Sequence, residues 1–588
     1  MNRTSSPKSS SSFGWKEPLF VFLLLLSVVA LAWPGMTSPP VLDDTLQTQH
    51  VATFESVVDC FTQPDCFGFM RPVKNLIYYA FHVSGNASPL TWHGFNLATH
   101  LLAVIAVYFL ARRLIQPWPW ALAAAGLWAL TPTMTCASIW MSCANINLGV
   151  GFLSLFLLAH LRSQASEKQS VGFTTVSGLI LFLSLFFYES LVVAVGLAFL
   201  CDRLVHQIKP TRPQMITYAI YGVTTVVYLA IRSMLGATQT SAGVSPGFPP
   251  DTTPFQVFLS APWFLLMHFK MWLFPINKIE FVSSYLWGVS ASPKDLIASW
   301  IIVLMIAGGA IAIWRRSPLF AFGLLWFGVA SFPSSNFIPI FAGPIADYYL
   351  IISSIGLALV VATMARGLFR SKDHPEWNNP KLVVGVMLAA LFLWRATFVP
   401  LYPQRAQLWN DPAALFLDVT QTRDHQYLAT SLAAIELANR GMPDEALILA
   451  DQAIEAAPFY APSYLVAGFA YSKQGKAEEA LGHLSKALDQ HGLTEFQVRA
   501  AHRESARLQI HQGDFAGARN SLLPLLEAEY DHEQKIPAIL LMSSLYEKQA
   551  NRERAIATIE KGLGIYPDEQ DLIAALKELD LPSETTKP

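Results

Sequence analysis

Apolar runs separated by short polar connections recur along the first 400 residues, and this pattern constrains the fold more than any other feature. A helix needs about 20 mostly apolar residues to cross a bilayer. Hydrophobic residues make up 53% of the chain and charged residues only 14%, which is too apolar for a soluble protein of several ordinary domains. We therefore expect a polytopic all-α membrane bundle. Its eleven predicted spans lie near 18–33, 95–111, 118–131, 143–161, 172–187, 190–205, 213–233, 295–314, 317–332, 346–367 and 381–399.

The first run, Pro18 to Trp33, resembles a signal peptide. No small-x-small cleavage pattern follows it cleanly, and many further apolar segments come after it. We interpret it as a retained first span that follows a cytoplasmic tail, residues 1–17.

The segment 255–275 is ambiguous because it is apolar but carries His268 and Lys270. Basic residues gather in the cytoplasmic connections of membrane proteins. They fall at every second connection of this chain only if 255–275 does not cross, so we expect an interfacial or re-entrant helix there. The basic connections are Arg3/Lys8/Lys16, Arg112/Arg113, Arg162/Lys168, Arg203/Lys209/Arg212, Arg315/Arg316 and Arg366/Arg370/Lys372/Lys381.

Eleven crossings from a cytoplasmic start place the C-terminal part outside. The same count predicts that five connections lie on the outer side: 34–94, 132–142, 188–189, 234–294 and 333–345. We expect a bacterial inner-membrane protein with a periplasmic C-terminal part, because Pro588 follows no dibasic or KDEL-like retention signal. In a eukaryote the corresponding location is the endoplasmic reticulum membrane with a lumenal C-terminal part.

Charge divides the chain in two. Residues 1–420 carry a net charge of +7, and residues 421–588 carry −9. The whole chain has a net charge of −2 and no long basic run, which argues against binding a nucleic acid. Its five cysteines form no CxxC pair, so a zinc knuckle or a thioredoxin-type motif is excluded. Cys60 and Cys66 are equally consistent with an outer-loop disulfide and with two free thiols.

The acidic C-terminal part contains an internal repeat with small residues at fixed places. Ala446, Ala453 and Pro458 recur 34 residues later as Ala480, Ala487 and Gly492, and the set returns as Ala555, Gly562 and Pro567. This pattern resembles tetratricopeptide repeats, which stack pairs of helices into a solenoid that binds peptides on its concave face. We expect about four repeats within 424–580. A purely structural lid on the membrane domain is the alternative.

Two adjacent carboxylates, Asp43 and Asp44, lie about ten residues past the first span. One suits the role of general base for an incoming hydroxyl, and the other can orient it. The pair could instead hold a divalent cation. We predict no firm cofactor.

Polar residues also mark the start of the second span. His93, Asn96 and His100 have helical spacing and share one face, and intramembrane polar residues on one face favour a cavity over lipid contact. No third metal ligand is evident, so we predict no metal there.

The order of these motifs resembles the transmembrane and tetratricopeptide repeat family of O-mannosyltransferase-like proteins, in the GT-C superfamily of glycosyltransferases. That superfamily uses polyprenyl-phosphate sugars as donors. The motifs that carry the resemblance are Asp43-Asp44, Arg71-Pro72 before His93…Asn96…His100, Pro132 leading to Trp140, Glu189 at an outer turn, Pro333-Ser334-Ser335-Asn336, and Gly343…Ala346-Asp347 before a late span. By this resemblance Asp43 is the catalytic base and outer basic groups hold the lipid phosphate.

The chain departs from the family at three cations. Tyr188 stands where Lys precedes the glutamate, Tyr348 stands where Arg follows the acidic residue, and an Arg usual beyond Trp140 is replaced near Ala144. We expect other cations to bind the donor phosphate, namely Arg71, Lys74, Arg232 and Lys270. The residues expected to line the cavity are His93, Asn96, His100, Glu189, Asn336, Asp347 and Tyr348.

These expectations predict a GT-C-like membrane domain at 18–400, a linker at 401–423, the repeats at 424–580 and a tail at 581–588. The expected function is transfer of a sugar from a polyprenyl phosphate to a protein hydroxyl that the repeats present. One alternative is a non-catalytic, membrane-anchored repeat scaffold. The other is a glycosyltransferase that acts on glycan or lipid acceptors.

Overall fold

The computed structural model confirms an all-helical chain. It describes residues 15–85, 88–164, 171–208, 211–235, 247–275, 283–337, 343–369, 391–422, 425–490, 492–527 and 532–580, and these contain no strand. The chain divides into two compact units. Unit 1 comprises Met1–Ser245 and Thr252–Thr422, and unit 2 comprises Pro246–Asp251 and Arg423–Pro588.

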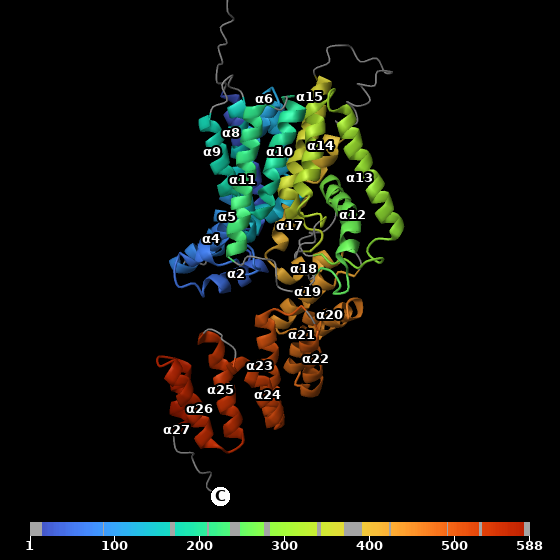
Figure 1. Cartoon of the computed structure of the whole chain (residues 1–588). Coiled ribbons are helices and arrows are strands. Elements are labelled where there is room, and N and C mark those ends of the chain that lie inside the picture. The colour runs from blue at the N-terminus through green and yellow to red at the C-terminus, as the bar shows by residue number, and fades with distance from the viewer. Residues whose placement is uncertain are drawn as a thin grey trace, which may run out of the picture. The chain divides into compact units, whose positions relative to one another are not determined.

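Unit 1 is a bundle of helices with several shorter helices, among them α2 and α4, at one end (Figure 1). Its longer helices are α1 (Lys16–Ala32), α5 (Pro89–Leu114), α6 (Trp118–Ala129), α8 (Ala144–Gln164), α9 (Val171–Leu185), α11 (Arg212–Met234), α12 (Pro254–Leu273), α13 (Pro293–Ile313), α14 (Pro318–Ser331) and α15 (Leu350–Phe369). Its shorter helices are α2 (Asp43–Val51), α3 (Asp59–Thr62), α4 (Pro72–Ser84), α7 (Thr135–Ile139), α10 (Ala194–Leu200), α17 (Leu401–Leu408) and α18 (Pro412–Thr420). One-turn 3₁₀ helices are η1 (Trp33–Gly35), η2 (Pro132–Met134), η3 (Met141–Cys143) and η6 (Asp347–Tyr349), and η4 (Glu189–Val193) is a slightly longer one.

The starts of many of these helices are set by local sequence. The backbone N–H groups of a helix's first turn have no acceptor within the helix, so proline, which lacks an N–H, costs no hydrogen bond there. Four helices begin at a proline: α4, α5, α13 and α14. Capping boxes begin α12 at Thr253 and α13 at Ser292. In each box a side-chain oxygen accepts a backbone N–H that has no partner within the helix.

Six helices among the described residues are long and apolar enough to cross a membrane, which supports a membrane protein. They are Lys16–Gly35, Pro89–Leu114, Met141–Gln164, Arg212–Met234, Pro293–Ile313 and Asp347–Gly367. A seventh results if Trp118–Ala129 and Pro132–Ile139, which meet at a bend of 64°, form one broken span. Helix α12, expected not to cross, is not among the six.

The other predicted spans are shorter than a membrane crossing requires or lie outside the description. The apolar helices Gly172–Leu185 and Pro318–Ser331 are below 18 residues. The segment 190–205 is broken into 3₁₀, α and π helix, because η4, α10 and the π-helical η5 (Cys201–Val205) follow one another. Most of 381–399 lies outside the described residues. The eleven-span topology therefore stays a prediction.

The predicted linker at 401–423 is wrong, because most of it folds as α17 and α18 within unit 1. The hydroxyl of Tyr402 lies 2.9 Å from the Ser138 hydroxyl and 3.2 Å from the Met134 carbonyl oxygen. The Asn410 amide donates to the Pro34 carbonyl at 2.7 Å.

Unit 2 consists of consecutive helices that pack against their neighbours in the chain. They are α19 (Tyr427–Asn439), α20 (Pro443–Ala456), α21 (Ala461–Lys473), α22 (Ala477–Asp489), α23 (Glu495–Gln512), α24 (Phe515–Glu527), α25 (His532–Lys548), α26 (Arg552–Ile565) and α27 (Gln570–Asp580). The repeated small residues are all buried: Ala446, Ala453, Ala480, Ala487, Ala555 and Gly562. At Gly468 a side chain would lie 2.7 Å from Leu484, so the small residue permits the close approach of α21 and α22.

The turns inside the helix pairs each contain a residue with positive φ. Gly441, Gly475 and Gly513 follow α19, α21 and α23 with φ of +77°, +76° and +79°. Ala550 takes the same place after α25 with φ of +56°. A residue with left-handed backbone just after a helix lets the following N–H groups bond the last carbonyl groups of that helix. Glycine adopts this conformation without a steric penalty. The repeat therefore extends to the turns as well as to the buried faces.

The number of crossings can be tested directly. Eleven or seven crossings place the two chain ends on opposite sides of the membrane, whereas six place them on the same side. We expect an alkaline phosphatase fusion after Pro588 to be active in a bacterium and a fluorescent cytoplasmic reporter at the same place to be dark. The opposite pair of results would overturn the predicted orientation.

Candidate functional site

Asp43 and Asp44 are the first two residues of α2, but their side chains have different surroundings. The Asp43 side chain keeps 26% of its surface exposed, whereas Asp44 is only 2% exposed. Leu42 precedes them with φ of +51°, a left-handed conformation that is costly for a branched residue and is often found at functional sites. The two carboxylates therefore have separate roles, one accessible and one structural.

Asp44 anchors α2 to the rest of the bundle. Its Oδ1 accepts the Tyr78 hydroxyl at 2.5 Å and the Ser142 backbone N–H at 3.0 Å. Burial raises the pKa of Asp44 to about 6, although the hydrogen bond from Tyr78 opposes the rise. This carboxylate joins α2, α4 and η3 at one point.

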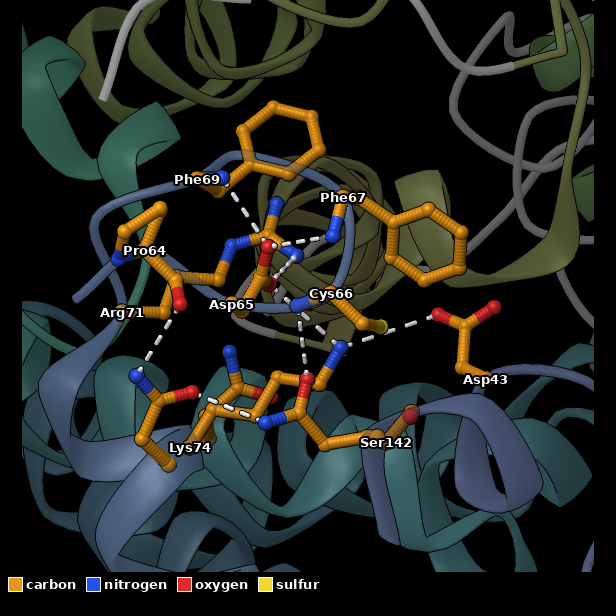
Figure 2. Close-up of polar contacts among 12 residues, drawn as sticks. Asp43, Pro64, Asp65, Cys66, Phe67, Phe69, Arg71, Lys74 and Ser142 are labelled. Atoms are coloured by element: carbon orange, nitrogen blue, oxygen red, sulfur yellow. Dashed lines mark hydrogen bonds and ion pairs between the residues drawn. The ribbon is translucent and has the colours of Figure 1, made fainter. Parts of the chain in front are cut away.

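Asp43 faces a buried lysine. Its Oδ2 lies 3.8 Å from the Lys74 ammonium, and Asp65 approaches the same ammonium at 3.5 Å from another direction (Figure 2). Loss of water around Asp43 raises the pKa of its carboxyl, and the positive charge of Lys74 lowers it in part. Burial by itself would lower the pKa of Lys74, but Asp65 and Asp43 keep it above its ordinary value. Lys74 is thus a permanent cation between two carboxylates.

Asp65, which the sequence analysis did not single out, organises this part of the loop. Its side chain is fully buried, and Oδ1 accepts the backbone N–H groups of Phe67 at 3.0 Å and Phe69 at 2.9 Å. Its Oδ2 lies 3.5 Å from both Lys74 and Arg71. The signal was a Pro-Asp-x-x-Gly turn, in which Asp bonds the backbone that follows and Gly68 adopts φ of +80°.

Arg71 forms a bidentate ion pair with Glu189. The guanidinium donates to the two carboxylate oxygens at 2.6 and 2.9 Å. The rings of Phe69 and Tyr188 lie 4.2 and 5.1 Å from its central carbon. Burial would raise the pKa of Glu189, but Arg71 and, less strongly, Arg232 hold it below its ordinary value. Arg232, on α11, therefore belongs to the same electrostatic neighbourhood.

Asp43, Lys74, Asp65, Arg71 and Glu189 form a row of alternating charge, which we call the charge chain. Successive members lie 3.8, 3.5, 3.5 and 2.6 Å apart. Lys270, the fourth expected phosphate ligand, is exposed on α12 and forms no ion pair with the charge chain within the described residues. The structure thus gathers three of the four expected cations.

Trp140, Tyr348 and Tyr349 form an aromatic cluster. The Trp140 and Tyr348 ring centroids lie 5.6 Å apart, and the Trp140 indole N–H donates at 3.3 Å to the carbonyl of Val41, two residues before Asp43. The Tyr348 ring lies edge-on against the Tyr349 ring at 4.5 Å. Tyr348 as a cavity-lining residue stays a prediction.

Asp347 and Asn336 do not line open space. Asp347 is buried and pairs with Arg405 of α17 at 3.4 Å. Asn336 is buried with φ of +60°, and its amide lies 3.4 Å from the Ser334 carbonyl oxygen. Both residues fix loops near the site and do not face it.

His93, Asn96 and His100 are likewise buried, so the expected polar cavity at the start of the second span is wrong. The two ring nitrogens of His93 lie 2.7 Å from the Ile139 oxygen and 2.8 Å from the Ser38 oxygen. Asn96 donates to the Ala137 carbonyl at 3.1 Å. The helical spacing did predict a shared face, but that face holds the short helix α7 against α5.

The carboxylate pair does not suit a bound divalent cation in this arrangement. Asp44 already accepts two hydrogen bonds on one oxygen, and the Lys74 ammonium lies where it would repel a metal at Asp43. Among the described residues no group of three His, Cys, Asp or Glu side chains is placed to hold a metal. Cys60 and Cys66 are free thiols and form no disulfide with each other.

Comparison with known proteins adds no relative. Neither the models of known protein families nor the curated proteins match this chain. The site must therefore be interpreted from its own geometry.

The role of Asp44 as a buried anchor predicts an unusual pH dependence of stability. The pKa of Asp44 is about 6 in the folded protein, above the ordinary value of 3.8. The free energy of unfolding therefore falls as pH rises from about 4 to about 6. We expect Asp44→Asn to raise the thermal unfolding midpoint at pH 8, by an amount equivalent to roughly 1–3 kcal/mol. At pH 5 that advantage should shrink, because wild-type Asp44 is then mostly protonated.

Tyr78→Phe is the matched control, since it removes the hydroxyl donor and keeps the ring. It should lower the midpoint at both pH values. Asp44→Asn could instead lower the midpoint at pH 8 as much as Tyr78→Phe does. That result would show that the charged carboxylate stabilises the fold, and would overturn the expected destabilisation by its burial.

Proposed function

We propose that this protein is a membrane glycosyltransferase of GT-C type, which moves a sugar from a polyprenyl-phosphate donor to a protein hydroxyl. The proposal includes eleven spans and a tetratricopeptide-repeat solenoid that presents the acceptor on the outer side of the membrane. It places the protein in a bacterial inner membrane, or in the endoplasmic reticulum membrane of a eukaryote. The resemblance in motif order to O-mannosyltransferase-like proteins is one support.

The observation that carries the proposal is the position of Asp43. It is the more accessible carboxylate of the pair, has a raised pKa, and lies beside the buried cation Lys74. A general base must be reachable by the acceptor and have a pKa closer to the working pH than an ordinary aspartate. Asp44 also has a raised pKa but fails the requirement of access, because it is buried and its Oδ1 already accepts two hydrogen bonds inside the protein.

Cations suited to a lipid phosphate lie on the other side of Asp65. Arg71 presents a planar fork of donors, and Arg232 adds a second guanidinium near Glu189. Arginine forks bind phosphate oxygens through paired, charge-assisted hydrogen bonds. A polyprenyl phosphate has its chain in the bilayer, so a phosphate site at the end of the helical bundle suits this donor.

The proposed reaction is a single displacement with inversion. Asp43 takes the proton of the acceptor hydroxyl while its oxygen forms a bond to the anomeric carbon of the sugar. The bond from that carbon to the phosphate oxygen breaks, and the lipid phosphate leaves with the electron pair. Arg71 and Arg232 stabilise the charge that develops on the leaving phosphate.

One ring of the aromatic cluster suits a sugar. Trp140 and Tyr349 are buried, but Tyr348 is only partly buried and has a flat apolar face with a polar edge. Pyranose rings have an apolar C–H face that packs on such surfaces. Tyr348 therefore supports a carbohydrate as one of the ligands.

The scaffold alternative is favoured by one observation, since Arg71 and Lys74 are both already paired with carboxylates. A scaffold that only gathers partners does not need Asp43. Transfer to a glycan or lipid acceptor needs Asp43 but not the repeats. The three functions thus differ in which part of the chain they require.

Loss of the base separates these functions. We expect Asp43→Asn to lower the rate of sugar transfer by on the order of 10²-fold or more, the usual scale for a missing general base. The protein level and thermal midpoint should stay close to wild type, because Asp43 is partly exposed. Incorporation of labelled sugar into protein by membranes that express each variant is the measurement.

Glu55→Gln is the matched control, since Glu55 is an exposed carboxylate in the same loop. It should leave transfer unchanged. Equal transfer in wild type, Asp43→Asn and Glu55→Gln, at equal protein levels, favours the scaffold.

The raised pKa of Asp43 also predicts how transfer depends on pH. The rate should fall on acidification at a pH above the ordinary aspartate range near 4, because the protonated carboxyl cannot accept the hydroxyl proton. Lys74 lowers the pKa of Asp43, so Lys74→Gln should move this acidic limb to higher pH. A profile of kcat/KM against pH that is identical for wild type and Lys74→Gln would contradict Asp43 as the titrating base.

A further inference from the structure

Glu189 already occupies the edge of Arg71 that a phosphate would use. The two donor nitrogens of Arg71 bind the two oxygens of Glu189 at 2.9 and 2.6 Å. A carboxylate and a phosphate present similar pairs of oxygens to a guanidinium. A phosphate therefore cannot form the same two-pronged contact with Arg71 until Glu189 leaves.

The contact between Arg71 and Glu189 is a partly exposed end of the charge chain, as Asp43 is at the other end. The Arg71 and Glu189 side chains are 13% and 17% exposed, whereas Lys74 and Asp65 are 2% and 0% exposed. Exchange of the inner pair would strand buried charges, which costs several kcal/mol. Exchange at Arg71 leaves Glu189 next to solvent, where a carboxylate is well hydrated.

Arg71 is held in place by contacts that do not involve Glu189. Asp65 binds another nitrogen of its guanidinium at 3.5 Å (Figure 2). The ring of Phe69 lies 4.2 Å from the guanidinium carbon, and the ring of Tyr188 lies 5.1 Å from it. These three contacts keep the donor fork oriented when its carboxylate partner is replaced.

Two guanidinium groups act on the single carboxylate of Glu189. Arg71 binds it directly, and Arg232 contributes a further favourable charge from α11. When Glu189 leaves, Arg71 and Arg232 lose a carboxylate that both act on. A phosphate group that takes its place supplies negative charge there again.

We propose that Glu189 is a displaceable internal anion, which occupies the phosphate site of Arg71 and is exchanged for the ligand's phosphate group. The identity of that ligand as a polyprenyl phosphate rests on the proposed function. The exchange keeps the two cations neutralised when no ligand is bound, and it helps to release the lipid phosphate product when Glu189 returns. It also lowers the apparent affinity for phosphate, because only the fraction of molecules with Arg71 vacated is competent to bind.

Purified full-length protein in detergent micelles tests the exchange. Glu189→Gln keeps the size of the side chain and removes its charge, so we expect a short-chain polyprenyl monophosphate to bind about tenfold more tightly, equivalent to about 1.4 kcal/mol. Glu189→Asp keeps the charge but shortens the reach, so its affinity should lie between those of Glu189→Gln and wild type. Glu55→Gln should match wild type, and Arg71→Ala should bind at least tenfold more weakly than wild type.

Inorganic phosphate is the second probe, and it separates the exchange from the proposed donor. Tighter binding of both probes by Glu189→Gln supports both ideas. Tighter binding of inorganic phosphate alone supports the exchange and overturns the polyprenyl donor. Unchanged or weaker binding of inorganic phosphate by both Glu189 variants, with thermal midpoints near wild type, overturns the exchange and makes Glu189 a residue that only orients Arg71.

Discussion

The loop at 34–94 depends on the interactions of one buried carboxylate, Asp65. A fully buried charge is tolerated only when it is paired and hydrogen-bonded. Asp65 meets this requirement with two backbone N–H groups and two cations, Lys74 and Arg71. Each cation in turn has a second carboxylate, Asp43 beside Lys74 and Glu189 beside Arg71. The positions of the accessible carboxylate Asp43 and of the Arg71 guanidinium therefore follow from one buried carboxylate.

The same end of unit 1 brings together segments that are far apart in the sequence. The loop at 34–94 contacts Ser142 through Asp44 and Glu189 through Arg71. Ser283 bonds Ile345 in both directions, at 2.7 and 3.0 Å, which joins two further connections. The five connections that the sequence predicts on one side of the membrane are thus joined in two groups, by contacts of polar side chains and backbone. Their common side stays a prediction.

The sequence predicted the residue types of the site better than their contacts. Asp43, Arg71 and Glu189 were identified from motif order, and they do lie in one charge chain. Helical spacing placed His93 and Asn96 on one face, but spacing does not tell a cavity from a packed neighbour, here the short helix α7. Contacts from distant segments have no local signal. Ser142 is an example, since it meets Asp44 across 98 residues of sequence.

Charge balance in this region is kept by residues from distant segments. Tyr188 stands where the resemblance predicts a lysine, and its ring lies 5.1 Å from the guanidinium of Arg71. Asp347 lacks the arginine expected next to it, but Arg405 of α17 reaches it from 58 residues further along the chain. Because a buried acid must be neutralised, the loss of an adjacent cation requires such a replacement from elsewhere in the fold. The folding of α17 into unit 1 supplies it, so part of the stretch predicted to be a linker neutralises a buried acid of unit 1.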